Sequence, residues 1–313
     1  MDPKTTQDSI AQLRSNMEKR IVGKGELIDR LIIALLSEGH VLLEDVPGVG
    51  KTSLARSLAD SLALSFSRIQ CTPDTMPGDI TGVSVYNSKT GSFEVVPGPV
   101  MNNIVLADEL NRTTPKTQSA LLEAMEENKV TIDGKDLPLP DPFMVIGTQN
   151  PLETAGTYPL PEAQLDRFMM KLSVGYPGKE DAVRMADRFL EGSLHEETKP
   201  VLEGKDIIDM RDQVKKVGVN EKLIDYAVMI VEETRTVPEI SCGASPRALL
   251  SMLRCAQAHA MLNGRDYCIP EDILNSAHLT LPHRLILTAQ ARMNHMSQAQ
   301  ILKTITNHIK VPS

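Results

Sequence analysis

A short glycine-containing segment constrains the fold of this chain more than any other part of its sequence. Gly48-Val49-Gly50-Lys51-Thr52 follows the apolar run Val41-Leu42-Leu43, which is typical of a buried strand, and precedes a helical pattern that ends near Ala63. In a strand–loop–helix of this kind, free backbone N–H groups surround a phosphate. The segment therefore predicts a phosphate-binding loop, with Lys51 on the β- and γ-phosphates and the Thr52 hydroxyl on Mg²⁺.

One position departs from the general pattern of such loops. The first glycine of the pattern falls at Asp45, which carries a charged side chain instead. Aspartate tolerates left-handed turns, so we expect the backbone of the loop to keep its shape.

Two acidic residues follow a second apolar strand. Ile104 to Ala107 is apolar throughout and leads directly into Asp108 and Glu109. The carboxyl ends of strands in an open α/β sheet face the crevice where ligands bind, so both carboxylates are expected near the phosphates. Asp108 is suited to hold the Mg²⁺ shell, and Glu109 to polarise an attacking water.

An amide and two arginines are further candidates. Asn150 follows a third strand-like stretch, residues 143–148, where its amide could bind the γ-phosphate and the water, although asparagine before proline also suits a turn. Arg167 could equally form a surface ion pair, which contributes little to stability. Arg247 falls in the first turn of a predicted helix, where a cation is disfavoured, and this points to an external anion.

The order of patterns along the chain predicts two domains. Strands alternate with helices up to a hinge at residues 173–178, which indicates a parallel sheet covered on both faces. Two segments interrupt the alternation and are typical of hairpins, one over residues 83–96 and one around Asp133-Gly134, and either could be a surface hairpin without a task. We therefore expect an α/β core over residues 1–175 and a smaller all-helical domain over residues 176–313.

Composition restricts the classes of function. The formal net charge is -8 and the pI is about 5.5, which argues against a nucleic-acid motor, because such proteins need clustered cations. No apolar run is long enough to span a bilayer, and the N-terminus lacks the apolar stretch of a signal peptide. We expect a cytoplasmic protein without membrane insertion, whose four cysteines are isolated thiols.

With these residues identified, the chain resembles the MoxR family of AAA+ ATPases. The likeness covers roughly residues 10–290 and rests on segments 39–52, 106–112, 115–125, 147–151 and 158–168. The resemblance implies a P-loop AAA+ core with β-hairpin inserts and a C-terminal helical lid. It also implies that Asp108 and Glu109 are the Walker B pair, that Asn150 is the sensor-1 residue, and that Walker A comprises Pro47, Gly48, Val49, Gly50, Lys51, Thr52 and Ser53.

The resemblance also gives roles to residues that the sequence alone leaves open. Arg167 matches the arginine finger, which reaches the nucleotide of a neighbouring subunit, and Arg247 matches the sensor-2 arginine of the lid. Val22, in Ile21-Val22-Gly23, matches a base-contacting segment. The first hairpin looks like the insert in helix 2 that marks this clade, and the second like the hairpin before sensor 1. Aspartate is frequent at position 45 in the family.

The function implied by the resemblance is ATP hydrolysis with Mg²⁺ in a homo-oligomeric ring, most simply a hexamer. The resemblance also implies that ATP binds between the core and the lid. Such proteins remodel or mature protein clients, often with a partner that carries a von Willebrand factor A (VWA) domain. A nucleic-acid motor is the first alternative, but residues 81–97 of the first hairpin carry only Lys89 as a cation, set against Glu94. A non-hydrolysing scaffold and a small-molecule kinase are others. The complete hydrolytic set disfavours the scaffold, and a kinase would need an acceptor pocket.

Overall fold

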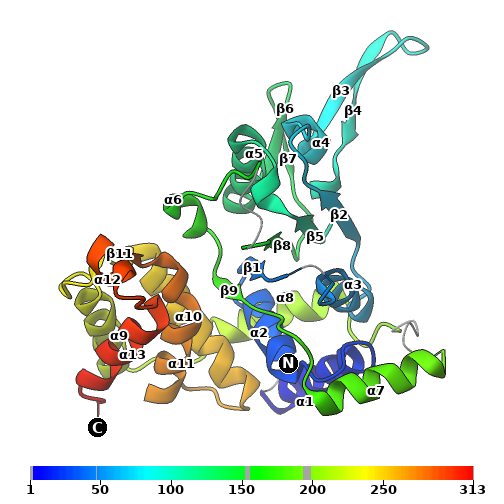
Figure 1. The fold of residues 1–313 in the computed structure, drawn as a ribbon. Coiled ribbons are helices and arrows are strands. Elements are labelled where there is room, and N and C mark those ends of the chain that lie inside the picture. Colours follow the sequence, from blue (N-terminus) through cyan, green and yellow to red (C-terminus); the bar gives the residue numbers. More distant parts are fainter. Residues whose placement is uncertain (1–2, 47, 152–155, 193–198, 313) are drawn as a thin grey trace.

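A parallel sheet forms the centre of the protein in the computed structural model, which describes residues 3–46, 48–151, 156–192 and 199–312 (Figure 1). Its five strands run in the order β2-β5-β8-β1-β9. Every neighbouring pair is parallel, which confirms the predicted sheet. The strands are β1 (Val41–Glu44), β2 (Phe66–Gln70), β5 (Ile104–Asp108), β8 (Met144–Gln149) and β9 (Met170–Leu172).

Alternate residues of the sheet face two hydrophobic cores. In β1, Val41 and Leu43 belong to one core and Leu42 to the other. Successive side chains of a strand point to opposite faces, so a strand that is covered on both faces is apolar throughout. The first core also contains residues of α1 (Pro3–Glu18), α2 (Gly25–Leu36) and α3 (Lys51–Ser61), and the second contains residues of α5 (Pro115–Glu127).

Local sequence sets the ends of α5. The Thr114 side chain accepts a hydrogen bond from the Thr117 N–H, and proline occupies the first helical position, where its missing N–H has no cost. The helix stops at Asn128, whose φ of 50° is left-handed. These ends place Glu126 in the last turn of α5.

Both predicted hairpins are present. β3 (Gly82–Asn87) pairs with β4 (Ser92–Pro97), and β6 (Lys129–Ile132) pairs with β7 (Lys135–Pro138), each antiparallel. The turn of the second hairpin has positive φ at both Asp133 and Gly134, the geometry that this dipeptide favours. The β3–β4 hairpin projects from the body of the molecule (Figure 1).

The chain after β9 is mostly helical, as predicted. Its helices are α7 (Lys179–Leu190), α8 (Gly204–Val214), α9 (Glu221–Glu233), α10 (Pro246–Leu262), α11 (Pro270–Thr280), α12 (Ala289–Met293) and α13 (Gln298–His308). One feature departs from the all-helical expectation. Two short strands, β10 (Ile240–Cys242) and β11 (Ile286–Leu287), pair antiparallel where extended connections between helices bury Ile240 and Leu287. The shorter helical elements of the chain are α4 (Pro77–Thr81), α6 (Glu162–Leu165), η1 (Pro99–Met101), η2 (Leu110–Arg112) and η3 (Pro282–Arg284).

The first hydrophobic core continues from the sheet into these later helices. It joins residues of α1 and α2 to residues of α9, α10 and α11 in one cluster. Figure 1 shows α9 to α13 gathered apart from α3, with β9 between the two groups. The boundary at residue 175 therefore marks a change of pattern within continuous packing, and as a domain boundary it stays a prediction.

Two composition-based expectations can be compared with the structure. Within the described ranges, no helix combines the length and the apolar character needed to cross a membrane. The four cysteines are unpaired, as expected. Burial raises the pKa of the Cys71, Cys255 and Cys268 thiols to about 12, so they remain neutral.

The contact between α10 and α11 yields a prediction about pH. The Asp272 carboxylate, 1% exposed, accepts bonds from Arg265, from His259 and from the Ile269 N–H. Burial alone would raise its pKa, but these bonds hold the pKa at about 2, below the ordinary 3.8. The resulting stabilisation is complete above about pH 4 and is lost as the pH falls through about 2. We expect Asp272→Asn to lower the free energy of unfolding at pH 7 by about 2 kcal/mol.

Urea unfolding from pH 7 to pH 3 checks this prediction. The difference between wild type and Asp272→Asn should shrink below pH 4, whereas Asp266→Asn, an exposed control, should change little at any pH. A difference of the same size at pH 7 and pH 3 would contradict the linkage.

Candidate nucleotide site

The loop between β1 and α3 leaves space for a phosphate. Gly48 and Gly50 have φ values of 84° and 91°, which are left-handed, and a Cβ built on either would have no atom within 4 Å. The N–H groups of the first turn of α3 have no partner within the helix, so they are available to an anion. The loop therefore fits the phosphates of a nucleotide. Pro47, also predicted here, lies outside the described residues.

Lys51 contacts its own loop in this structure. Its Nζ donates to the backbone oxygen of Asp45 at 2.6 Å. Burial lowers the pKa of this lysine, although Asp108, Asp45 and Glu109 act in the opposite direction. A phosphate in the loop would offer Lys51 a full negative charge in place of one carbonyl.

Asp45 connects the loop to the segment after β9. Its carboxylate accepts from the Val46 N–H at 2.9 Å, the Ser173 hydroxyl at 2.8 Å and the Gly175 N–H at 2.6 Å. Burial raises the pKa of Asp45, but these hydrogen bonds outweigh burial and lower it. Asp45 does not have positive φ, so the expected reason for its tolerance, a left-handed turn, was wrong. The loop tolerates aspartate at this position because its carboxylate accepts these three hydrogen bonds.

The two acidic residues lie at the carboxyl end of β5, as predicted. The Thr148 hydroxyl donates to Asp108 at 2.7 Å and accepts from the Glu109 N–H at 2.9 Å. One side chain of β8 thereby fixes both residues of the neighbouring strand. Arg68, on β2, pairs with the other Asp108 oxygen at 2.6 Å.

Glu109 has an unusual backbone. Its φ is 57°, a left-handed conformation that costs energy for a residue with a Cβ and that often occurs at functional sites. Its carboxylate accepts from Gln70 Nε2 at 3.1 Å and from Arg112 at 3.0 Å. Sequence reasoning missed Arg68 and Gln70, although two polar residues at alternate positions near the end of β2 were a usable signal.

Asn150 follows β8, which lies between β1 and β5 in the sheet. The residue is 6% exposed. It is therefore placed between the end of the strand that leads into the loop and the end of the strand that carries the acidic pair. The predicted role of its amide, binding the γ-phosphate and the attacking water, stays a prediction.

A mainly apolar cavity adjoins the loop. It has a volume of about 140 Å³, and its lining includes Val22, the predicted base-contacting residue, beside Val49, Gly50 and Ser53 of the loop. Val174, Pro177 and Met185 also line it. No sequence pattern pointed to these three residues, because the segment after β9 and α7 reach the loop only through tertiary packing.

Arg167 and Arg247 lie together in a different place. Arg167 pairs with Glu126 at 2.9 Å, and Arg247 pairs with the other oxygen of the same carboxylate. Both arginines line a cavity of about 590 Å³ between the core and α10. None of its lining residues also lines the cavity beside the loop. The helices α10 and α11 pack against α2 and β9, and Arg247 does not share a cavity with the loop of its own subunit. Its predicted role as a nucleotide-binding residue stays a prediction.

Comparison with known proteins decides the family. The family described as "ATPase family associated with various cellular activities (AAA)" matches residues 40–170, and the AAA lid domain matches residues 232–305. Chaperone MoxR1 of Mycobacterium tuberculosis is 40% identical over 305 residues, covering 95% of this chain and 80% of that protein. This chain belongs to the MoxR family of AAA+ ATPases.

Two further relatives are similar along almost the whole chain. "Uncharacterized protein YeaC" of Bacillus subtilis is 49% identical over 297 residues, or 95% of this chain and 93% of that protein. A crystal structure from Cytophaga hutchinsonii, of a protein named as a candidate ATPase, has a TM-score of 0.93 and 40% identity. It covers 99% of this chain, and this chain covers 97% of it. The AAA+ core with a helical lid is thus confirmed, and membership of the family implies nucleotide binding.

Proposed function

We propose that this MoxR-family protein binds ATP with Mg²⁺, hydrolyses it in a ring, most simply a hexamer, and uses the cycle to remodel a protein client. The observation that carries the proposal is the juxtaposition of the open glycine loop with Asp108 and Glu109. The loop follows β1, the acidic pair follows β5, and β8 lies between these strands and binds both acidic residues through Thr148.

The chain offers a group for each task of phosphoryl transfer. The N–H groups around Gly48 and Gly50 hold the phosphates. Lys51 gives up its hydrogen bond to the Asp45 carbonyl and binds the phosphate oxygens instead. Thr52 and Asp108 would hold Mg²⁺, which neutralises phosphate charge when bound. Glu109 polarises the attacking water, and Asn150 orients it.

The arginines support a site shared between subunits. Arg167 and Arg247 both form ion pairs with one carboxylate, Glu126, and line a cavity separate from the one beside their own phosphate loop. We infer that both act on the ATP of a neighbouring subunit, where the γ-phosphate would replace Glu126 as their anionic partner. This assignment gives Arg247 a nucleotide-binding role that its position relative to its own loop does not support.

The projecting hairpin supports a protein client. Tyr86 and Phe93 are 56% and 70% exposed, and their rings meet edge to face with centroids 5.4 Å apart. Lys89 and Glu94 are the only charged residues of this hairpin and have opposite signs, so it presents mainly apolar and uncharged polar groups. Such a surface suits protein more than nucleic acid. One relative is named as a chaperone, which agrees with this proposal. We also propose that the protein works with a partner that carries a VWA domain.

A titration of protein concentration tests the shared site. ATP turnover per subunit should be low in the dilute protein and rise as subunits associate, because arginine fingers contribute about 10³–10⁵ in rate. Phosphate release should be measured from nanomolar to high micromolar protein at saturating ATP. Turnover per subunit that stays flat across this range, while sedimentation shows association, would exclude a finger acting between subunits.

A further inference from the structure

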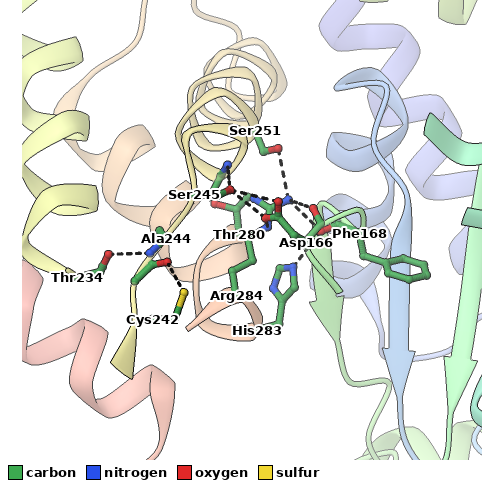
Figure 2. A network of polar contacts seen from close by, with 12 residues as sticks. Asp166, Phe168, Thr234, Cys242, Ala244, Ser245, Ser251, Thr280, His283 and Arg284 are labelled. Atoms are coloured by element: carbon green, nitrogen blue, oxygen red, sulfur yellow. Dashed lines mark hydrogen bonds and ion pairs between the residues drawn. The ribbon is translucent and has the colours of Figure 1, made fainter. Parts of the chain in front are cut away.

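The loop that carries Arg167 is held by the lid of the same subunit. Asp166, Arg167 and Phe168 connect α6 to β9, and Figure 2 shows Arg284 and His283 of η3 meeting this loop. One nitrogen of Arg284, Nη2, donates to the backbone oxygens of Asp166 and Phe168, each at 3.0 Å. The lid therefore binds the residue before the finger and the residue after it.

Three further contacts complete this connection. Nε of Arg284 lies 3.1 Å from an Asp166 carboxylate oxygen, and the Ser245 hydroxyl donates to the same carboxylate at 3.2 Å. Nε2 of His283 donates to the Phe168 oxygen at 2.9 Å. The donors come from the start of α10 and from η3, two separate parts of the lid (Figure 2). With both flanking carbonyls fixed, the backbone of Arg167 has little freedom to move independently of the lid.

The side chain that makes most of these bonds is costly to bury. Arg284 is 2% exposed, and among the described residues neither its Nε, which is in ion-pair contact with Asp166, nor its Nη1 has a hydrogen-bond partner. Burial lowers its pKa to about 10, so it remains charged at neutral pH. A buried ion pair is often no more stabilising than apolar side chains of the same volume. Stability alone therefore does not account for an arginine here, whereas holding two carbonyls through Nη2 and the Asp166 carboxylate through Nε with one planar group does.

The tip of the finger is less constrained than its backbone. Arg167 is partly exposed and reaches Glu126, and it lines the same cavity as Arg247 and Arg284. The lid thus fixes where the finger starts, and the cavity leaves its guanidinium free to meet an anion.

We propose that Arg284 is a positioning residue for Arg167, so that the lid of one subunit sets the arginine finger for the ATP of its neighbour. The proposal rests on the proposed function, in which Arg167 acts between subunits. Arg284 itself contacts no nucleotide in this account.

Arg284→Lys tests the proposal, because lysine keeps the charge but has a single nitrogen, which cannot hold the two carbonyls and the Asp166 carboxylate at the same time as Nη2 and Nε of Arg284 do. ATP turnover should fall about 10- to 100-fold, the effect of a finger displaced by roughly 1 Å. Affinity for a fluorescent ATP analogue should be unchanged, because the variant's own loop is intact. Arg292→Lys is the matched control: Arg292 is an exposed arginine of α12 that lines neither this cavity nor the one beside the loop, so its replacement should leave turnover unchanged.

Mixing with a second variant separates positioning from general damage. Lys51→Ala subunits cannot hydrolyse ATP but carry an intact finger loop. In an equal mixture with Arg284→Lys, about a quarter of the sites should combine an intact phosphate loop with an intact finger. Turnover per subunit should therefore recover to about a quarter of the wild-type value. An Arg167→Ala mixture with Lys51→Ala serves as the reference for a finger defect.

The outcomes distinguish this proposal from the proposed function. Unchanged turnover in Arg284→Lys overturns the positioning role, and so does a loss that Lys51→Ala does not rescue while the Arg167→Ala reference is rescued. Failure of the reference itself refutes the finger between subunits. If Arg284→Lys does not fold, as judged by its thermal unfolding, Asp166→Asn replaces it. This variant weakens the same contact from the loop side, and its rescue or lack of rescue decides in the same way.

Discussion

Arg167→Ala should lower ATP turnover per subunit by about 10³–10⁵, the largest effect that we expect from any single substitution outside the P-loop. The lost guanidinium would otherwise neutralise charge that develops on the phosphoryl group in the transition state. Nucleotide affinity of the dilute, unassociated subunit should stay within about twofold, because the cavity of Arg167 shares no lining residue with the one beside the loop. Phosphate release at saturating ATP and fluorescence titration of a nucleotide analogue measure the two effects.

The control for this substitution lies outside both cavities. Arg292→Ala removes an equal charge from an exposed position of α12, so its turnover should match wild type. An equal mixture of Arg167→Ala and Lys51→Ala should regain about a quarter of wild-type turnover per subunit, since that fraction of sites combines two intact halves. A mixture that forms joint assemblies and yet stays inactive would show that Arg167 does not act on a neighbour.

Glu109→Gln should lower turnover by about 10²–10⁴ while ATP stays bound. The amide has the shape of the carboxylate and can remain near Gln70 and Arg112, but it cannot accept a proton from water. The expected signature is therefore loss of turnover with unchanged affinity, measured by phosphate release and by nucleotide retention on gel filtration.

Glu94→Gln is the matched control for Glu109→Gln. It removes one carboxylate from the exposed hairpin, away from the acidic pair, and should not change turnover. Equal turnover of Glu109→Gln and wild type would favour a nucleotide-binding scaffold that does not hydrolyse ATP.

Much of the core could be predicted because its signals are local. The loop, its flanking strand and helix, the acidic pair and both hairpin turns are each encoded within about ten consecutive residues, where periodicity and turn chemistry operate. β9 and the β10–β11 pair were missed, since strands of two or three residues have no measurable period. They are stabilised by their neighbours: β9 by β1, and β10 by β11.

The arginines show why the rest could not be predicted. What an arginine does depends on the anionic group that it binds. For Arg167 and Arg247 that group is Glu126, which precedes them in the chain by 41 and 121 positions, respectively. The resemblance supplied their names as finger and sensor. It did not say which groups lie beside Arg247, whereas packing of the lid against β9 and α2 brings this arginine to the finger.

The sequence by itself determined that this chain has a phosphate loop at Gly48 to Thr52 and an acidic pair at the end of a parallel strand. Backbone conformation and strand polarity follow from neighbouring residues, and they are enough to bring these groups to one edge of a sheet. Only the tertiary structure decided that Asp45 bonds to the segment after β9, and that Arg284 holds the finger loop 118 positions before it. Such contacts depend on how the lid closes against the core, and no local pattern encodes that geometry.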